Sequence, residues 1–232
     1  MLFLVLSFLA SLIPLFLLFF WLRGQKNTQE IHRDQCKKAL GRGMLAVLPV
    51  VLTSAVLHIG WRLLKLPDGM MFKAFYAFVV LAFSEELWKF IAFKRVIKDH
   101  PASWLEMAIY SSIVGLGFEI LEAVEYAFGS NSIQMIVRGV TAMHAGYGFL
   151  TGYFYGKGKA QNKPLLKMVG FVFSWLMHGL YDFGLTDELL EMNDNFAFIS
   201  VSLAIFALVI LIWLISFVRK ARKREECTCV LV

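Results

Sequence analysis

Long runs of apolar residues, separated by short polar segments, occupy almost the whole chain. Each run has about 20 residues, which as an α-helix is long enough to cross the ~30 Å hydrocarbon core of a bilayer. The pattern predicts an all-α protein, a polytopic transmembrane helix bundle with about seven spans. The predicted spans are 1–22, 44–64, 70–93, 105–127, 133–155, 167–185 and 196–218.

The composition also indicates a membrane protein. Of the 232 residues, 59% are hydrophobic, and a soluble domain of this length would need more polar surface. We therefore predict a first transmembrane helix at 1–22, a basic cytoplasmic loop at 23–43, a transmembrane core at 44–218 and a basic cytoplasmic tail at 219–232. The first helix lacks a basic start and a small-residue cleavage pattern, so we expect it to be retained and not removed as a signal peptide.

Basic residues are concentrated in alternate connections between the spans. The formal net charge is +6, but this distribution is a topology signal and does not favour nucleic-acid binding. It predicts a multi-pass protein of the cell membrane with its N-terminus outside and its C-terminus in the cytoplasm. The three cysteines lie in these basic segments, so no structural disulfide is expected in the reducing cytoplasm. The last four residues, from Cys229, fit a prenylation pattern only loosely.

Ionisable residues also occur inside the predicted spans, where a charge costs on the order of 3 kcal/mol. Such residues are rare in transmembrane helices and indicate function or pairing inside the bundle. The third to sixth spans carry them, and we expect Glu119 and Glu125 to lie towards the membrane edge. The candidates for a site or a buried pair are Glu85, Glu86, Lys89, Glu119, Glu122, Glu125, Arg138, His144, His178 and Asp182.

Helical spacing places several of these side chains on common faces. Glu85 and Lys89 are four residues apart, and Glu86 is three from Lys89, so Lys89 can neutralise one carboxylate of the pair. Two adjacent buried carboxylates do not both ionise easily, and their titrations are coupled. His178 and Asp182 are also four residues apart, which lets both face one cavity.

Most of these groups are predicted to lie at a similar depth in the membrane. Counting ~1.5 Å per residue from the cytoplasmic end of each span puts Glu85 about 12 Å deep and His144 and His178 about 17 Å deep. Glu122, at about 24 Å, needs a tilted helix or a shifted span end to join them. An ion pair of Arg138 with Glu122, which lies at matching depth, or with Glu125 is the structural alternative.

These residue types leave three chemistries open. A buried carboxylate can take a proton from water and pass it to a leaving amine, as peptide hydrolysis requires. The same carboxylates and imidazoles could instead hold Zn²⁺, although the chain has no His-Glu-x-x-His element. Chains of buried acids and histidines also suit a proton-coupled transporter, but no inverted repeat is evident. We favour hydrolysis of a peptide bond inside the membrane, with no metal or other cofactor.

Four short motifs on successive spans resemble those of the PrsW family of glutamic-type intramembrane proteases, within the superfamily of CAAX proteases and Abi proteins. The motifs cover about half of the chain and occur in the family's order. Ala123 departs from the pattern, because the family often has Asn after the second-motif glutamate. The motifs are Glu85-Glu86-x-x-Lys89, Phe118-x-x-x-Glu122, His144 with a Gly/aromatic stretch, and His178-Gly-Leu-Tyr-Asp182-Phe183.

The resemblance implies a role for each motif residue. Glu85 would be the general base, with Glu86 and Lys89 tuning it. Glu122 would help to hold the attacking water, beside the supporting Phe118. His178 and Asp182 would orient or stabilise the oxyanion, and His144 would complete the polar wall.

The resemblance also implies a kind of substrate. PrsW-like proteases carry out site-1 cleavage of a membrane-anchored protein, and in the characterised case that protein is an anti-sigma factor. We therefore expect the partners of this chain to be the lipid bilayer and a single-span membrane protein.

Overall fold

The computed structural model describes residues 2–23, 33–66, 69–98, 102–129, 141–184 and 195–225. Throughout these ranges the regular structure is helical and contains no strand, which confirms the predicted all-α class. The helices are α1 (Leu2–Arg23), α2 (Arg33–Leu45), α3 (Val47–Leu63), α4 (Met70–Phe75), the π-helix η1 (Tyr76–Phe83), α5 (Ser84–Ile97), α6 (Trp104–Gly129), α8 (Met143–Ala160), α9 (Pro164–Gly184) and α11 (Asn195–Glu225).

Each predicted span corresponds to a helical segment, but several ends differ. Only Ala46 separates α2 from α3, so residues 33–43, expected in a basic loop, are helical. Likewise α11 continues to Glu225, beyond the predicted span end at 218, whereas Cys229 lies outside the described residues. Among the described residues, two helices are long and apolar enough to cross a membrane, Asp34–Leu63 and Trp104–Val124.

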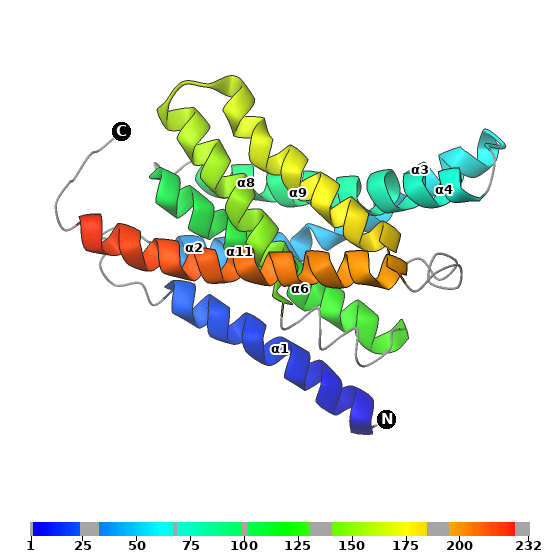
Figure 1. The fold of residues 1–232 in the computed structure, drawn as a ribbon, viewed down its shortest axis with the longest axis horizontal. Helices are drawn as coiled ribbons and strands as arrows, with labels where there is room; N and C mark the ends of the chain where they lie inside the picture. Colours follow the sequence, from blue (N-terminus) through cyan, green and yellow to red (C-terminus); the bar gives the residue numbers. More distant parts are fainter. Residues whose placement is uncertain are drawn as a thin grey trace.

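Helix α6 is the centre of the bundle and packs against α1, α2, α5 and α8 (Figure 1). Its residues from Leu105 to Ile120 are all buried. A capping box starts it: Ser103 N–H donates to Glu106 Oε2 at 2.7 Å, and Glu106 N–H donates to Ser103 Oγ at 3.2 Å. This reciprocal pair satisfies backbone donors that the first turn of a helix leaves open.

Glycines allow α6 and α8 to touch at the backbone. A Cβ atom at Gly115 of α6 would collide with the backbone carbonyl of His144, and one at Gly148 of α8 would collide with that of Ser111. Such small residues are how transmembrane helices approach closely. The contact seats the backbone of His144 directly against the central helix.

A tight turn returns the chain from α8 to α9, so that the two helices lie side by side (Figure 1). Asn162 adopts a left-handed conformation, with φ at 52°, and Lys163 N–H donates to Gly158 O at 2.8 Å. A left-handed residue with this hydrogen bond is a common way to end a helix. The turn places the far end of α9, which carries His178, beside the start of α8.

Large apolar side chains are exposed on the outer helices. Helix α11 packs on α8 and α9 through one face and exposes Val201, Ile205 and Val209 on another. Helix α3 likewise exposes Leu48, Leu52 and Val56. In a soluble protein such continuous apolar surface would be unfavourable, whereas lipid chains can cover it.

Candidate active site

The π-helix η1 leads directly into the acidic pair on α5. Its wider hydrogen-bonding pattern is held by side chains from both neighbouring helices. Trp175 Nε1 of α9 donates to Phe78 O at 2.6 Å, and Ser54 Oγ of α3 donates to Val80 O at 2.8 Å. π-Helical turns are rare and occur frequently at functional sites. Here η1 sets the rotation at which α5 begins, and both Glu85 and Glu86 are buried.

One oxygen of the Glu86 carboxylate has two hydrogen-bond partners. Its Oε1 lies 2.6 Å from Lys89 Nζ and 3.0 Å from His178 Nδ1, and all three side chains are buried. A carboxylate only accepts hydrogen bonds, so both nitrogens donate to it. The pairing compensates the charge of Glu86. It also fixes the orientation of the His178 ring, whose other nitrogen, Nε2, lies near Glu85 and Asp182.

His144 connects Lys89 to Glu122. Lys89 Nζ lies 2.7 Å from His144 Nδ1, and His144 Nε2 lies 2.6 Å from Glu122 Oε2. An ammonium can only donate, so Nδ1 accepts and a neutral His144 carries its proton on Nε2, which it donates to Glu122. Lys89 Nζ also lies 4.7 Å from the centre of the Phe118 ring, a favourable cation–π distance.

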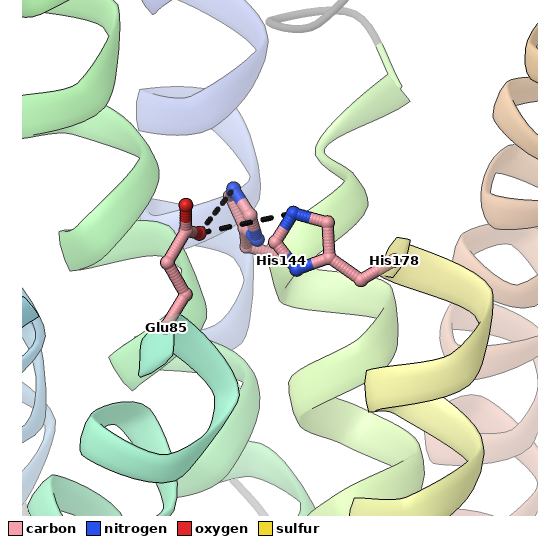
Figure 2. Close-up of side chains that lie close together, drawn as sticks. All are labelled: Glu85, His144 and His178. Carbon is pink, nitrogen blue, oxygen red and sulfur yellow. Dashed lines mark ion pairs between the residues drawn. The ribbon is translucent and has the colours of Figure 1, made fainter. Parts of the chain in front are cut away.

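The carboxylate of Glu85 faces the rings of both His144 and His178 (Figure 2). Its Oε2 is 3.7 Å from Lys89 Nζ, 3.9 Å from His144 Nε2 and 3.8 Å from His178 Nε2. These distances exceed hydrogen-bond length, and this buried oxygen has no hydrogen-bond partner among the described residues. Because a buried acceptor without a partner is costly, its persistence indicates a place for a small ligand such as water.

Asp182 completes the cluster from the next turn of α9. Its Oδ2 lies 3.3 Å from His178 Nε2, so His178 contacts a carboxylate through each ring nitrogen. The structure thus brings all the sequence-predicted site residues into one group. They are Glu85, Glu86, Lys89, Phe118, Glu122, His144, His178 and Asp182.

The helix ends explain why Glu122 is not the outlier expected from the sequence. Helix α8 ends at Ala160 and α9 begins at Pro164, so these two helix ends lie several residues beyond the predicted span ends. His144 is therefore about 24 Å from its helix end, close to the about 27 Å of Glu122. Arg138, the alternative partner of Glu122, lies outside the described residues.

Two sequence expectations around the site need comment. Glu119 is buried inside the bundle with 3% exposure, and its place towards the membrane edge stays a prediction. The side chain of Glu125 lies outside the described residues. Burial of Glu119 follows from the central position of α6, which apolar periodicity alone did not reveal.

Sequence reasoning missed two features near the start of α8. Ala142 adopts a left-handed conformation, with φ at 42° and ψ at 49°, which is strained for a residue with a Cβ. Tyr147, one turn after His144, has a buried hydroxyl without a hydrogen-bond partner among the described residues. The spacing of Tyr147 from His144 was the available signal, but an aromatic residue in an apolar span usually means packing.

The cluster also fits a divalent metal. Glu85, His144 and His178 each offer one ligand atom, and these atoms lie within 4.8 Å of one another. Carboxylate and imidazole are the donors that catalytic Zn²⁺ takes, and Glu85 Oε2 has no hydrogen-bond partner among the described residues. For His144 Nε2 to bind a metal, its proton would have to move to Nδ1 in place of the bond from Lys89. Glu86 bonds the far nitrogen of His178, as carboxylates do behind metal-bound histidines.

Carboxylates and imidazoles gathered inside a bundle of apolar helices, two of which are long enough to cross a membrane among the described residues, are typical of an intramembrane hydrolase. The comparison with known families specifies which one. The chain belongs to the PrsW family: the model described as "PrsW family intramembrane metalloprotease" matches residues 34–215. The predicted family and membrane localisation are thereby confirmed, and the chain is a multi-pass membrane peptidase, which disfavours the transporter alternative.

Similar proteins agree with this assignment. Protease PrsW of Oceanobacillus iheyensis is 26% identical over 190 residues, covering 79% of this chain and 80% of that protein. Protease PrsW of Geobacillus kaustophilus is 26% identical over 147 residues, covering 60% of this chain and 62% of that protein. No solved structure matches the chain.

Proposed function

We propose that this peptidase hydrolyses a peptide bond of a single-span, membrane-anchored protein, with Glu85 as the general base that activates water. The observation that carries the proposal is the position of Glu85 Oε2. It is buried, has no hydrogen-bond partner among the described residues, and faces an ammonium and two imidazoles at 3.7, 3.9 and 3.8 Å. A water between these groups would be held beside an acceptor that can take its proton.

The reaction would proceed through a tetrahedral intermediate. Glu85 Oε2 accepts a proton from water while the water oxygen bonds to the scissile carbonyl carbon, whose oxygen becomes an oxyanion. Glu85 then passes the proton to the nitrogen of the leaving amine as the C–N bond breaks. The products are a new carboxyl terminus and a new amino terminus, and Glu85 returns to its starting state.

The two adjacent carboxylates would have different roles in this reaction. Glu86 Oε1 accepts from both Lys89 Nζ and His178 Nδ1, so this oxygen is engaged in holding those side chains. Glu85 Oε2 has no hydrogen bond to the described residues, and we take it as the proton acceptor of the pair. We assign Glu86 and Lys89 to positioning, and Glu122 with His144 to holding the water.

A metal-dependent route is the second candidate, favoured by the 4.8 Å grouping of donor atoms and by the family description. Glu85, His144 and His178 would hold the ion, with Glu122 beside His144. When bound, a divalent metal would activate the attacking water and polarise the scissile carbonyl. Metal analysis of purified wild type and His178→Ala, together with cleavage after exhaustive chelation, separates this route from the glutamic-type route. Stoichiometric metal in wild type alone, with activity lost on chelation, would establish it.

Co-expression with candidate single-span proteins, anti-sigma factors first among them, tests the function. Wild type is compared with Glu85→Gln, Glu86→Gln, Glu122→Gln, His144→Ala and His178→Ala at matched protein levels. We expect one or more candidates to be cut by wild type and left intact with Glu85→Gln. Equal cleavage in all five variants would remove the assignment of this cluster as the active site.

A further inference from the structure

The polar cluster has few hydrogen-bond donors to spare for an oxyanion. A carboxylate such as Asp182 cannot donate. His178 Nδ1 donates to Glu86, and its Nε2 lies 3.3 Å from Asp182 Oδ2. Lys89 Nζ is shared between Glu86 Oε1 and His144 Nδ1. Two of the three N–H groups of Lys89 are therefore engaged, and the ammonium has Glu85 Oε2 a further 3.7 Å away, so one ammonium N–H is the donor that these groups leave.

Tyr147 carries a donor that is not engaged. Its side chain is fully buried, and its hydroxyl has no hydrogen-bond partner among the described residues. A tyrosine hydroxyl usually finds a partner when buried. The residue follows His144 by three positions on α8, so both share a helix face.

The position of Tyr147 is fixed beside the cluster. Its ring lies 6.3 Å from the His178 ring, centre to centre, at an interplanar angle of 32°. Ser174 Oγ of α9 donates to the backbone oxygen of Tyr147 at 3.0 Å, which ties this turn of α8 to α9. Packing of the ring and the hydrogen bond to its backbone therefore hold Tyr147 in place, while its hydroxyl makes no hydrogen bond to the described residues.

We propose that Tyr147 is a further catalytic residue, whose hydroxyl donates a hydrogen bond to the scissile carbonyl oxygen as that oxygen becomes an oxyanion. The proposal rests on the proposed peptidase reaction. Attack by water needs one free acceptor for the proton and one free donor for the oxyanion. Within the part of the chain that the structure describes, Glu85 Oε2 and Tyr147 Oη are a buried acceptor and a buried donor without hydrogen-bond partners, and the reaction would satisfy both. The phenol keeps its proton throughout.

Tyr147→Phe tests the proposal because it removes one oxygen atom and keeps the ring. The probe is a single-span reporter that wild type cuts and Glu85→Gln does not. Loss of an oxyanion donor typically costs roughly 10²–10³ in kcat. We expect a fall of that order with KM within about twofold of wild type, because the hydroxyl would act only in the transition state. The Tm in detergent should not fall, since no bond is lost.

Tyr110→Phe is the matched control. Tyr110 is also buried, but its hydroxyl donates to Glu106 Oε1 at 3.4 Å, near the start of α6. This variant should keep kcat and lose some thermal stability. A fluorinated tyrosine incorporated at position 147, a stronger donor of nearly the same shape, should retain cleavage.

Two outcomes would overturn the proposal. If Tyr147→Phe cuts the reporter at the wild-type rate, the hydroxyl has no catalytic role. If its activity falls only together with Tm, the hydroxyl is structural. Failure of folded wild-type protein to cut any reporter would instead remove the proposed function together with this role, so the two failures are distinguishable.

Discussion

At the scale of single residues, Glu85 and Glu86 are neighbours in sequence with different surroundings. Glu86 supports a buried lysine and a buried histidine, whereas Glu85 Oε2 is left with ion-pair distances only. Burying a charge is tolerated when it is paired, and removing one partner leaves the other uncompensated. The two residues should therefore respond differently to the same substitution.

Glu86→Gln should lower the free energy of unfolding by about 3–5 kcal/mol, the usual cost of breaking a buried ion pair. Glu85→Gln should change stability far less and abolish most activity, by at least about 10²-fold for loss of a general base. Thermal unfolding in detergent and reporter cleavage measure the two effects. The same loss of stability in both variants would contradict the distinction between them.

The sequence predicted the members of the site better than their contacts. The i, i+4 spacing revealed the pairing of Glu85 with Lys89 and of His178 with Asp182, because one helix fixes both partners. The bonds from Lys89 to His144 and from Glu86 to His178 cross between helices. Those depend on how α5, α8 and α9 pack, which spacing along one segment does not determine.

At the scale of elements, η1 determines the direction in which the side chains of Glu85 and Glu86 point, because α5 follows it directly. Its carbonyls at Phe78 and Val80 are bonded by Trp175 and Ser54 from two other helices. If η1 tightened to an α-helix, the helix on one side of it would rotate relative to the other. The pair Glu85 and Glu86 would then turn away from the imidazoles.

Trp175→Phe should lower kcat by about tenfold or more, because it removes the bond to Phe78 O and keeps an aromatic ring against Phe83. Trp88→Phe is the control. It loses a comparable bond, from Trp88 Nε1 to Thr53 Oγ1 at 2.9 Å, outside η1. Each variant should lose about 1 kcal/mol of stability. Equal activity in the two variants would show that η1 does not set the site.

The sequence predicted where most helices lie but missed η1 and α2. A stretch such as 76–83, in which every residue is aliphatic or aromatic, predicts an ordinary span, since it has no alternation of polar and apolar residues that could distinguish a π-helix from an α-helix. Residues 33–43 were predicted as a loop from their basic charge. Cys36, Ala39 and Gly43 nevertheless form a small-residue stripe, and all three are buried, with Gly43 against the backbone of α6.

At the scale of the whole molecule, one end of the bundle carries lysines against aromatic rings. Lys157 Nζ lies 4.0 Å from the Trp104 ring centre, and Lys94 Nζ donates to Tyr155 Oη at 2.9 Å. Aromatic residues and lysines are enriched where helices leave the membrane. We predict that this end is the cytoplasmic interface, with the active site buried below it.

Cysteine labelling tests this orientation. A cysteine placed at position 159 or 220 in a variant without native cysteines should react in intact cells only with a membrane-permeant reagent. A cysteine at position 66, at the end of α3, should react with an impermeant one. If position 66 reacted only with the permeant reagent and position 159 or 220 reacted with the impermeant one, the predicted topology would be contradicted. The proposed geometry of the active site does not depend on this result.

The central claim is that Glu85, within one buried cluster of acids and imidazoles, activates the water that cuts the substrate. Its most direct test is cleavage of a purified single-span reporter in proteoliposomes that contain this protein alone. Wild type should release the fragment, and Glu85→Gln, folded with wild-type Tm, should release it at least about 10²-fold more slowly. Cleavage by Glu85→Gln at the wild-type rate would contradict the account.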